Sequence, residues 1–114
     1  MRSPSRGEIW LAYTPGQPHD PHQPRYVLVI STDARNRAAD DFLVVPVFSR
    51  GRLGPTRVAV PPGSSGLQWE SVLYCEEITT IHADFLEDGP RGRVNQSILE
   101  EVVVAVRRAI GDFS

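Results

Sequence analysis

Arg25 is the residue whose type and position best suit chemistry, because it opens an unbroken aliphatic stretch that runs to Ser31. This apolar stretch, bounded by Pro24 and Asp33, predicts a strand buried on both faces. A guanidinium at the start of such a strand would reach solvent from a rigid backbone, which suits phosphate recognition. An arginine that flanks a strand is, however, more often a solvated end or an ion-pair partner. The position alone leaves both interpretations open.

Two further clusters carry polar side chains that could act on a ligand. His19, Asp20 and His22 are metal-ligand types, but two histidines three residues apart in a proline-rich loop are more often solvated. We therefore expect no metal site there. Glu76 and Glu77 could form a catalytic carboxylate pair, although such a pair more often marks a strand end that meets solvent or an arginine.

The composition is that of a globular protein with one modest core. The chain has 114 residues, of which 40% are hydrophobic and 23% charged, so we expect a single domain over residues 1–114 and no extensive disorder. The N-terminus lacks the apolar segment of a signal peptide, and no run is long enough to span a membrane, which predicts a cytoplasmic location. Cys75, the lone cysteine, excludes an internal disulfide and a cysteine-rich zinc site, and we expect it to be a small buried hydrophobe.

Charge is unevenly distributed, although the formal net charge is only -2. Residues 1–57 hold eight arginines and five acidic residues, whereas residues 58–114 hold four arginines and nine acidic residues. The net charge disfavours a simple basic nucleic-acid binder. All twelve basic residues are arginine, which either reflects base composition of the genome or serves bidentate phosphate contacts.

Apolar and β-branched runs predict five or six short strands separated by irregular loops. In the first, Ile9, Leu11 and Tyr13 should share one face, and Pro46 should mark a bulge or an edge near the end of the third. Short helical turns are expected within 32–41 and 83–88. The predicted strands cover residues 8–13, 25–31, 42–49, 56–60 and 71–78, with a brief strand after the turn at 89–93.

An amphipathic helix of about four turns should close the chain, starting at Asn95 or Ser97 and stopping at Gly111. Ser97 and Glu100 resemble a capping box. The elements together predict a mainly β (α+β) fold, a small and strongly bent barrel with a helix packed on it. The apolar stripe of the helix comprises Ile98, Val102, Ala105, Val106, Ala109 and Ile110.

Five local strings, in this order along the chain, resemble the MazF/PemK-like toxins of the CcdB/MazF superfamily. The resemblance runs from Arg6 to Ile110, and the final helix matches the family in length and position. The strings are Arg6–Trp10 (R-G-[DE]-[IV]-[WY]), Arg25–Ser31 (R-P-V-L-V-[IV]-S), the downstream Asn36, Val44–Ser49 (V-x-P-[IV]-[ST]-[ST]) and Ser71–Ile81 (S-V-[IA]-L-x-[ED]-Q-[IV]-[RK]-[TS]-[IL]).

The resemblance implies a fold, an activity and partners. The fold would be an SH3-like barrel of five to seven strands with a C-terminal helix. The activity would be that of a toxin of a type II toxin-antitoxin system, a cytoplasmic endoribonuclease (mRNA interferase) that cuts single-stranded RNA at a short sequence without a metal or other cofactor. Family members are homodimers whose interface groove binds RNA and is blocked by a segment of the cognate antitoxin; no membrane is involved.

The resemblance also implies a catalytic pair, which would fall on Arg25 and Ser49. The ribose 2′-hydroxyl would attack the adjacent phosphate and leave a 2′,3′-cyclic phosphate and a 5′-hydroxyl end. A guanidinium suits the anionic phosphorane, and a hydroxyl can hold a non-bridging oxygen. Arginine is a poor general base, because its pKa is too high. Asp20 stands where many members carry a glutamate, five residues before the arginine, and could take part in catalysis or contact a base.

Further residues could contact RNA. Tyr26 replaces the family's proline and could stack on a base, with a partly buried structural tyrosine as the alternative. The loop before it also lacks the usual S-E-Q-x-G pattern. Arg50, Arg52 and Arg57 could line the groove beside Ser49, and a solvated turn is an equal alternative for each.

Two other functions are compatible with the same fold. A CcdB-like inhibitor would bind DNA gyrase without catalysis, but it should carry a tryptophan-rich C-terminal tip, which residues 110–114 lack. An inactive relative would bind RNA or a partner and cut nothing. The presence of both Arg25 and Ser49 favours the ribonuclease.

Overall fold

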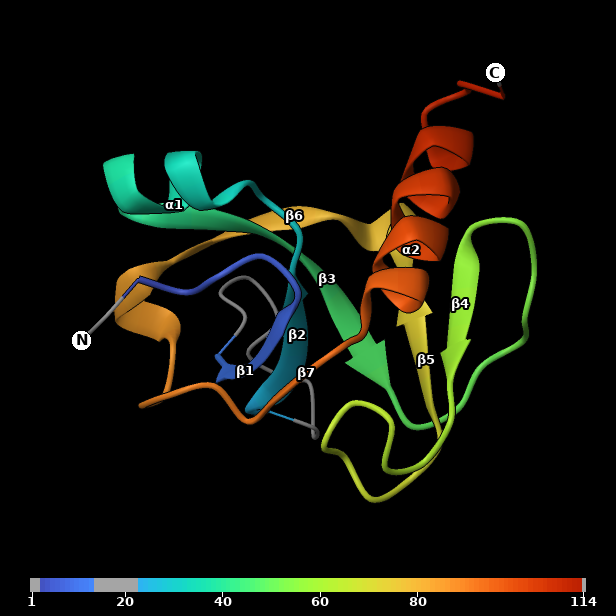
Figure 1. Ribbon diagram of the computed structural model, residues 1–114, viewed down its shortest axis with the longest axis horizontal. Coiled ribbons are helices and arrows are strands. Elements are labelled where there is room, and N and C mark those ends of the chain that lie inside the picture. Colours follow the sequence, from blue (N-terminus) through green and yellow to red (C-terminus); the bar gives the residue numbers. More distant parts are fainter. Residues whose placement is uncertain (1–2, 14–22, 114) are drawn as a thin grey trace.

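The fold, seen in a computed structural model that describes residues 3–13 and 23–113, is a curled antiparallel sheet with one long helix against it (Figure 1). Within these residues the strands run in the order β4-β5-β3-β2-β1-β7, and β6 also pairs with β3. The predicted mainly β fold with a C-terminal helix is therefore confirmed. The elements are β1 (Glu8–Ala12), β2 (Arg25–Val29), α1 (Asp33–Ala38), β3 (Asp41–Phe48), β4 (Arg57–Val60), β5 (Ser71–Tyr74), the 3-10 helix η1 (Cys75–Glu77), β6 (Thr79–His82), the 3-10 helix η2 (Ala83–Phe85), β7 (Gly92–Arg93) and α2 (Gln96–Ala109).

Strand β3 organises the sheet, because it changes partner along its length. One edge pairs with β2, while the other pairs with β6 up to Val44 and with β5 from Val47 onward. Pro46 lies in the gap between these two partners. A proline has no N–H to donate, so it fits where the ladder is interrupted. The irregularity expected at Pro46 is this change of partner.

Both faces of the central strands β1 and β2 are buried. The sequence predicted this for β2 but not for β1. Ile9 and Leu28 belong to one buried cluster, whereas Trp10 and Val27 belong to a second cluster on the opposite face. Trp10 is completely buried. The predicted strand over 8–13 is one residue too long, because β1 ends at Ala12 and Tyr13, which was expected on the same face as Ile9 and Leu11, is exposed beyond it.

The predicted strand over 71–78 is wrong in its second half, because β5 ends at Tyr74. The chain turns through η1 and then pairs with the other half of β3 as β6. Cys75 lies at this corner and is fully buried, as predicted. Burial raises the pKa of its thiol to about 12, so the thiol stays protonated near neutral pH.

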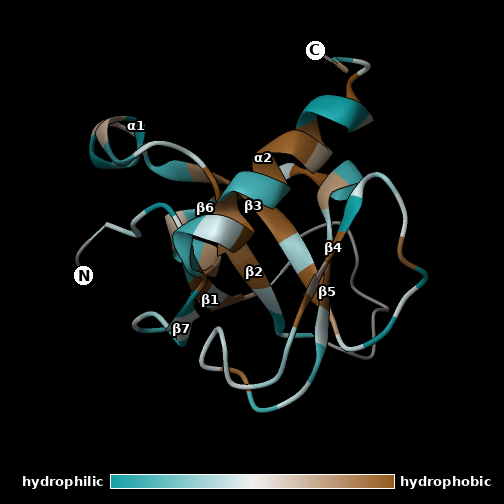
Figure 2. Cartoon of the chain, turned by 45° about the vertical axis from the view of Figure 1, so that its right-hand side comes forward, coloured by the Kyte–Doolittle hydropathy of each residue, from teal (hydrophilic) through white to brown (hydrophobic). Residues whose placement is uncertain are grey.

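Helix α2 packs its apolar side on the sheet beside β4 and η1, as the hydropathy colouring shows (Figure 2). Asn95 caps the helix, because its side chain accepts a hydrogen bond from the Ile98 N–H at 2.8 Å. The expected capping box at Ser97 is therefore wrong. Ile110 was expected on the buried stripe but is 73% exposed, since the last turn extends beyond the sheet (Figure 1). The buried helix residues are Ile98, Leu99, Val102 and Ala105.

The short helical turns predicted within 32–41 and 83–88 are present as α1 and η2. Neither α1 nor any other helix in the described part of the chain is both long and apolar enough to cross a membrane.

Candidate active site

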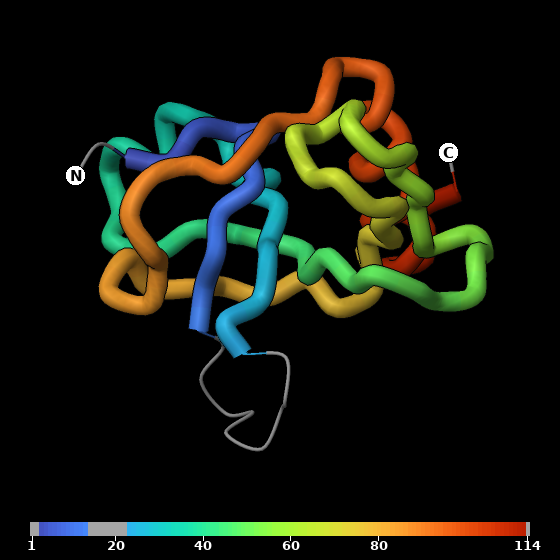
Figure 3. Tube along the Cα trace, turned by 90° about the horizontal axis from the view of Figure 1, so that it is seen from below, coloured from blue at the N-terminus to red at the C-terminus, as the bar shows by residue number. Residues whose placement is uncertain are grey.

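A groove of about 580 Å³ lies where β2 begins and β3 ends. It brings together four residues that the sequence analysis selected, namely Arg25, Tyr26, Ser49 and Arg50. These residues lie in two segments more than twenty positions apart in sequence, and the β2–β3 pairing places their ends side by side (Figure 3). The groove is lined by Gln23, Pro24, Arg25, Tyr26, Val47, Phe48, Ser49, Arg50 and Trp69.

Arg25 is the first residue of β2 and is held by an aromatic ring from β3. Its guanidinium carbon lies 4.0 Å from the centroid of the Phe48 ring. A cation over a ring face is attracted by the ring's negative charge density, so this contact fixes the guanidinium beside the groove. Arg25 also lines a second groove of about 280 Å³, which is bounded by Thr79 and Thr80 of β6. The cation therefore stands between two grooves.

A continuous stack extends from Arg25 across the sheet; we call it the arginine-aromatic stack. The rings of Phe48 and Tyr74 have centroids 4.0 Å apart, and the guanidinium carbon of Arg57 lies 3.8 Å from the centroid of Tyr74. Arg57 in turn forms an ion pair with Glu76, with 2.8 Å between Nη2 and Oε2. The hydrogen bond from Arg57 lowers the pKa of Glu76, and the carboxylate raises the pKa of Arg57.

The turn that carries Ser49 and Arg50 is tied to β5. The hydroxyl of Tyr74 donates a hydrogen bond to the carbonyl oxygen of Arg50 at 3.0 Å. Gly51 follows, and any side chain there would collide with the Tyr74 ring. The absence of a side chain at Gly51 thus lets Tyr74 fix the turn, so the Ser49 hydroxyl is presented from a defined backbone.

Arg52 and Arg57 are not among the residues that line the groove. Arg52 is exposed and its carbonyl oxygen accepts a hydrogen bond from Arg57 at 3.2 Å. Arg57 forms an ion pair with Glu76. The sequence analysis took a strand end that meets solvent or an arginine as the more common reason for two adjacent glutamates, and this interpretation is confirmed for Glu76. Asp20 lies outside the described residues.

His19 and His22 also lie outside the described residues. Among residues 3–13 and 23–113, no three histidine, cysteine, aspartate or glutamate side chains gather as a metal site would require. Nothing described here could hold a cofactor by such a cluster.

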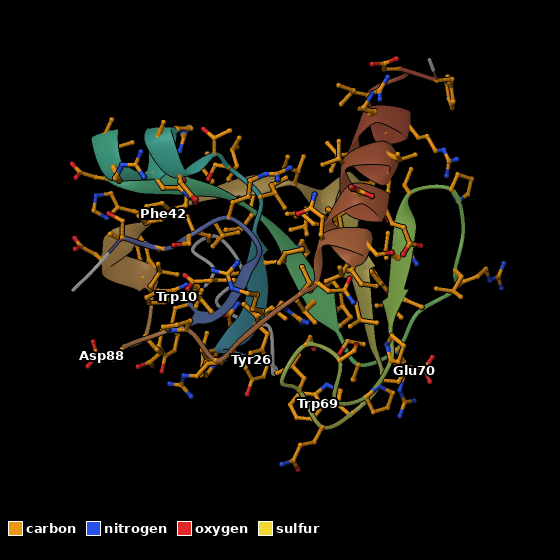
Figure 4. The ribbon with its side chains drawn as sticks, in the orientation of Figure 1. Trp10, Tyr26, Phe42, Trp69, Glu70 and Asp88 are labelled. Atoms are coloured by element: carbon orange, nitrogen blue, oxygen red, sulfur yellow. The ribbon has the colours of Figure 1, made fainter. Side chains whose placement is uncertain are left out.

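Trp69, like Phe48, is a groove residue that sequence reasoning missed. It belongs to the loop between β4 and β5, and its ring centroid lies 5.6 Å from that of Tyr26 (Figure 4). The available signal was a tryptophan in an otherwise polar, glycine-rich and proline-rich loop, where a buried role is unusual. Its place beside Arg25 depends on the path of that loop, which residue types do not reveal.

Comparisons with known proteins identify the family of the chain. The family model described as a PemK-like, MazF-like toxin of type II toxin-antitoxin systems matches residues 5–110. The chain is 33% identical over 100 residues to the Endoribonuclease PemK of Escherichia coli, which covers 86% of this chain and 75% of that protein.

Solved structures share the fold over almost the whole chain. An endoribonuclease in complex with its cognate antitoxin, from a mycobacterial species, has a TM-score of 0.78 and 26% identity, and the match covers 96% of each chain. MazF from Deinococcus radiodurans has a TM-score of 0.80 at 23% identity over 97% of this chain and 99% of that chain, which supports the fold.

The family model and the PemK relative assign this curled sheet with its helix to the toxin class expected from the sequence. The chain belongs to the PemK-like, MazF-like toxin family of type II toxin-antitoxin systems. The enzyme class of the family, endoribonuclease, agrees with the sequence-based prediction and favours it over the gyrase inhibitor.

Proposed function

We propose that this toxin cuts single-stranded RNA, above all mRNA, at a short sequence and without a metal ion. The observation that supports this best is the groove that holds the fixed cation Arg25 and the hydroxyl of Ser49 together. In the cleavage step the 2′-oxygen forms a bond to the adjacent phosphorus, and the bond from phosphorus to the 5′-oxygen breaks. The products are a 2′,3′-cyclic phosphate and a 5′-hydroxyl end.

Each groove residue has a distinct role in this proposal. Arg25 carries a permanent positive charge that stabilises the phosphorane, whose negative charge grows in the transition state. Ser49 donates a hydrogen bond to a non-bridging oxygen. The 2′-hydroxyl must lose a proton and the 5′-oxygen must gain one, and Arg25 is a poor base for this because its pKa is too high. We propose that Asp20 either transfers a proton in this step or contacts a nucleobase of the RNA.

The RNA strand would continue along residues beside this pair. Tyr26 and Arg50 line the groove and are proposed to contact a base and a phosphate. Arg52 is exposed just beyond the turn and could contact the next phosphate. Arg57 is paired with Glu76. We propose that it affects RNA binding indirectly, by supporting the arginine-aromatic stack that ends at Arg25.

We propose a homodimer of single-domain chains whose activity in the cytoplasm is controlled by a cognate antitoxin. A mycobacterial relative was solved with its antitoxin, and the second groove beside Arg25 offers room for a protein segment that competes with RNA. No cofactor or membrane is required by this proposal.

The test is RNA cleavage in the presence of a chelator. The purified protein is incubated with a long unstructured RNA, and both ends of the fragments are mapped. Arg25→Ala and Ser49→Ala should each slow cleavage, with the larger loss, on the order of a hundredfold to a thousandfold, for Arg25→Ala. Discrete cuts with cyclic phosphate ends would support the proposal.

Arg37→Ala is the matched control, because Arg37 is an exposed arginine of α1, at the opposite end of β3 from the groove. It should cleave like the unmodified protein. RNA left intact across diverse sequences would contradict the proposed ribonuclease, and cleavage abolished by the chelator would contradict its independence of metals.

A further inference from the structure

The exposure of Trp69 is unusual for a residue of its type. Trp69 is 42% exposed, whereas Trp10, the other tryptophan, is completely buried. A large apolar ring left in contact with water forgoes hydrophobic stabilisation, and a ligand that covers it would recover this stabilisation. Trp69 lines the same groove as Arg25 and Arg50. A ring beside two cations is a combination that matches the alternating bases and phosphates of a single strand.

The loop that carries Trp69 is fixed to the rest of the sheet. Leu67 is buried in the core cluster, and the carbonyl oxygen of Ser65 accepts a hydrogen bond from the Arg93 N–H at 2.9 Å. Gly92 permits this approach, because a side chain there would collide with the Ser65 carbonyl oxygen. Figure 3 shows this loop lying against the segment that leads into α2. Trp69 is therefore held in place before any ligand arrives, which lowers the entropy cost of binding.

Tyr26 supports Trp69 from the side. The two ring planes are inclined by 58°, a tilted geometry at a centroid distance that is favourable for aromatic pairs. Figure 4 shows both residues together at the same edge of the molecule. Tyr26 directly follows Arg25 in β2, so one strand positions both the cation and the ring that contacts Trp69. The distance between a stacked base and a bound phosphate would consequently be fixed.

From these contacts we propose that Trp69 is a platform on which one unpaired base stacks, next to the phosphate held by Arg25. Trp69 would thereby help to set which RNA sequences are cut, with Tyr26 as its support. This inference rests on the proposed ribonuclease and adds a specificity-determining residue to it. Aromatic platforms suit single-stranded RNA, because every unpaired base has a face that can stack.

The first experiment measures binding through tryptophan fluorescence. The probe is an oligonucleotide of the mapped cut sequence, with a 2′-deoxy nucleotide at the attacking position so that it is not cleaved. Because Trp10 is buried, quenching on binding should report Trp69. Trp69→Ala should abolish the quenching and weaken binding by about tenfold to a hundredfold, while Trp69→Phe should recover part of the affinity.

The second experiment locates the base. Abasic nucleotides are placed one at a time along the same oligonucleotide. At one position next to the cut site, base removal should weaken binding to the unmodified protein but have no further effect on Trp69→Ala. Phe113→Ala is the control, because Phe113 is a 77% exposed ring beyond the end of α2. Thermal unfolding of every variant checks that the fold is retained.

The outcomes separate this inference from the function on which it rests. If the unmodified protein cuts RNA while Trp69→Ala binds and cuts the same sequences equally well, the platform is wrong and the ribonuclease stands. If no RNA is cut or bound by the unmodified protein, the ribonuclease fails and the platform falls with it. Quenching by an antitoxin peptide but not by the oligonucleotide would also overturn the platform.

Discussion

At the scale of single residues, the position of Phe48 shows how the groove holds its cation. The motif that Val44–Ser49 resembles has two hydroxyl positions, and here the first is Phe48 and the second is Ser49. The ring at the first position lies under the guanidinium carbon of Arg25. A cation–π contact of this kind holds the guanidinium by its charge.

Replacing the ring should therefore weaken catalysis more than folding. For Phe48→Leu we expect kcat to fall about twofold to thirtyfold, which corresponds to the ~0.5–2 kcal/mol of a cation–π contact. Initial cleavage rates at saturating RNA measure this change. Phe85→Leu, at a 39% exposed ring in η2, is the control and should leave kcat unchanged. Equal rates for Phe48→Leu and the unmodified protein would refute the role of the ring.

The far end of the stack makes a prediction about pH. Arg57 lowers the pKa of Glu76, so the pair stabilises the fold above the ordinary glutamate pKa of about 4.3 and loses this effect as the pH falls further. Glu76→Gln should lower the melting temperature at pH 7 by a few degrees at most, roughly the effect of a partly exposed ion pair.

The measurement is thermal unfolding of both proteins from pH 7 to pH 2.5. The difference between them should shrink in the acid range, because Glu76 becomes protonated there. Glu101→Gln changes an exposed glutamate of α2 and serves as the control, with no comparable difference at pH 7. A difference that stays constant down to the lowest pH would show that charge is not the cause.

Part of this site could be predicted from the sequence. Arg25, Ser49 and Arg50 were expected to lie together because Arg25–Ser31 and Val44–Ser49 resemble strands of the family; the local strand patterns alone do not show which strands pair. Trp69 could not be placed with them, since its position results from a loop anchored through Gly92 and Ser65. Such a close backbone approach involves residues far apart in sequence and leaves no local pattern.

At the scale of elements, prediction succeeded where hydrophobic periodicity is long and failed where the chain turns a corner. The fourteen-residue helix α2 follows the expected period, so its position was correct to within two residues. The apolar run from Ser71 continues past the end of β5, because Cys75 is buried at the corner and not within a strand. An apolar run reports burial, and burial alone does not reveal a bend.

The start of α2 tests which residue is the cap. Asn95→Ala should cost about 1 kcal/mol and lower the melting temperature by roughly 4–8 °C, because the Ile98 N–H loses its partner. Ser97→Ala is the matched control, since Ser97 is exposed in the first turn and should change stability by less than about 0.5 kcal/mol. The reverse order of effects would restore the capping box predicted from the sequence.

At the scale of the whole molecule, two buried clusters lie on opposite faces of the same three strands. Strand β3 pairs with β6 along its first half and with β5 along its second half, so neither of these two parts of the sheet can detach without disrupting β3. This arrangement favours a single cooperative unfolding transition. The order of strands could not be predicted, because nothing local indicates that β3 changes partner at Pro46.

Cys75 provides a test of this cooperativity. The thiol is fully buried and its pKa is raised to about 12, so both access and protonation protect it in the folded protein. We expect a thiol reagent at pH 8 to label Cys75 only as fast as the molecule unfolds. Labelling rates across a urea series should follow the loss of far-ultraviolet circular dichroism. Rapid labelling without urea would indicate local opening at the corner between β5 and β6.

The order in which the core is completed has a consequence for synthesis of the toxin. All residues that line the groove of Arg25 and Ser49 lie before position 70. Strand β7, which pairs with β1, and helix α2, which supplies Ile98 and Val102 to the core, both follow position 90. A nascent chain therefore carries its groove residues well before it can fold around them. We expect the groove to reach its native geometry only after α2, which ends at Ala109, has been made and can complete the core.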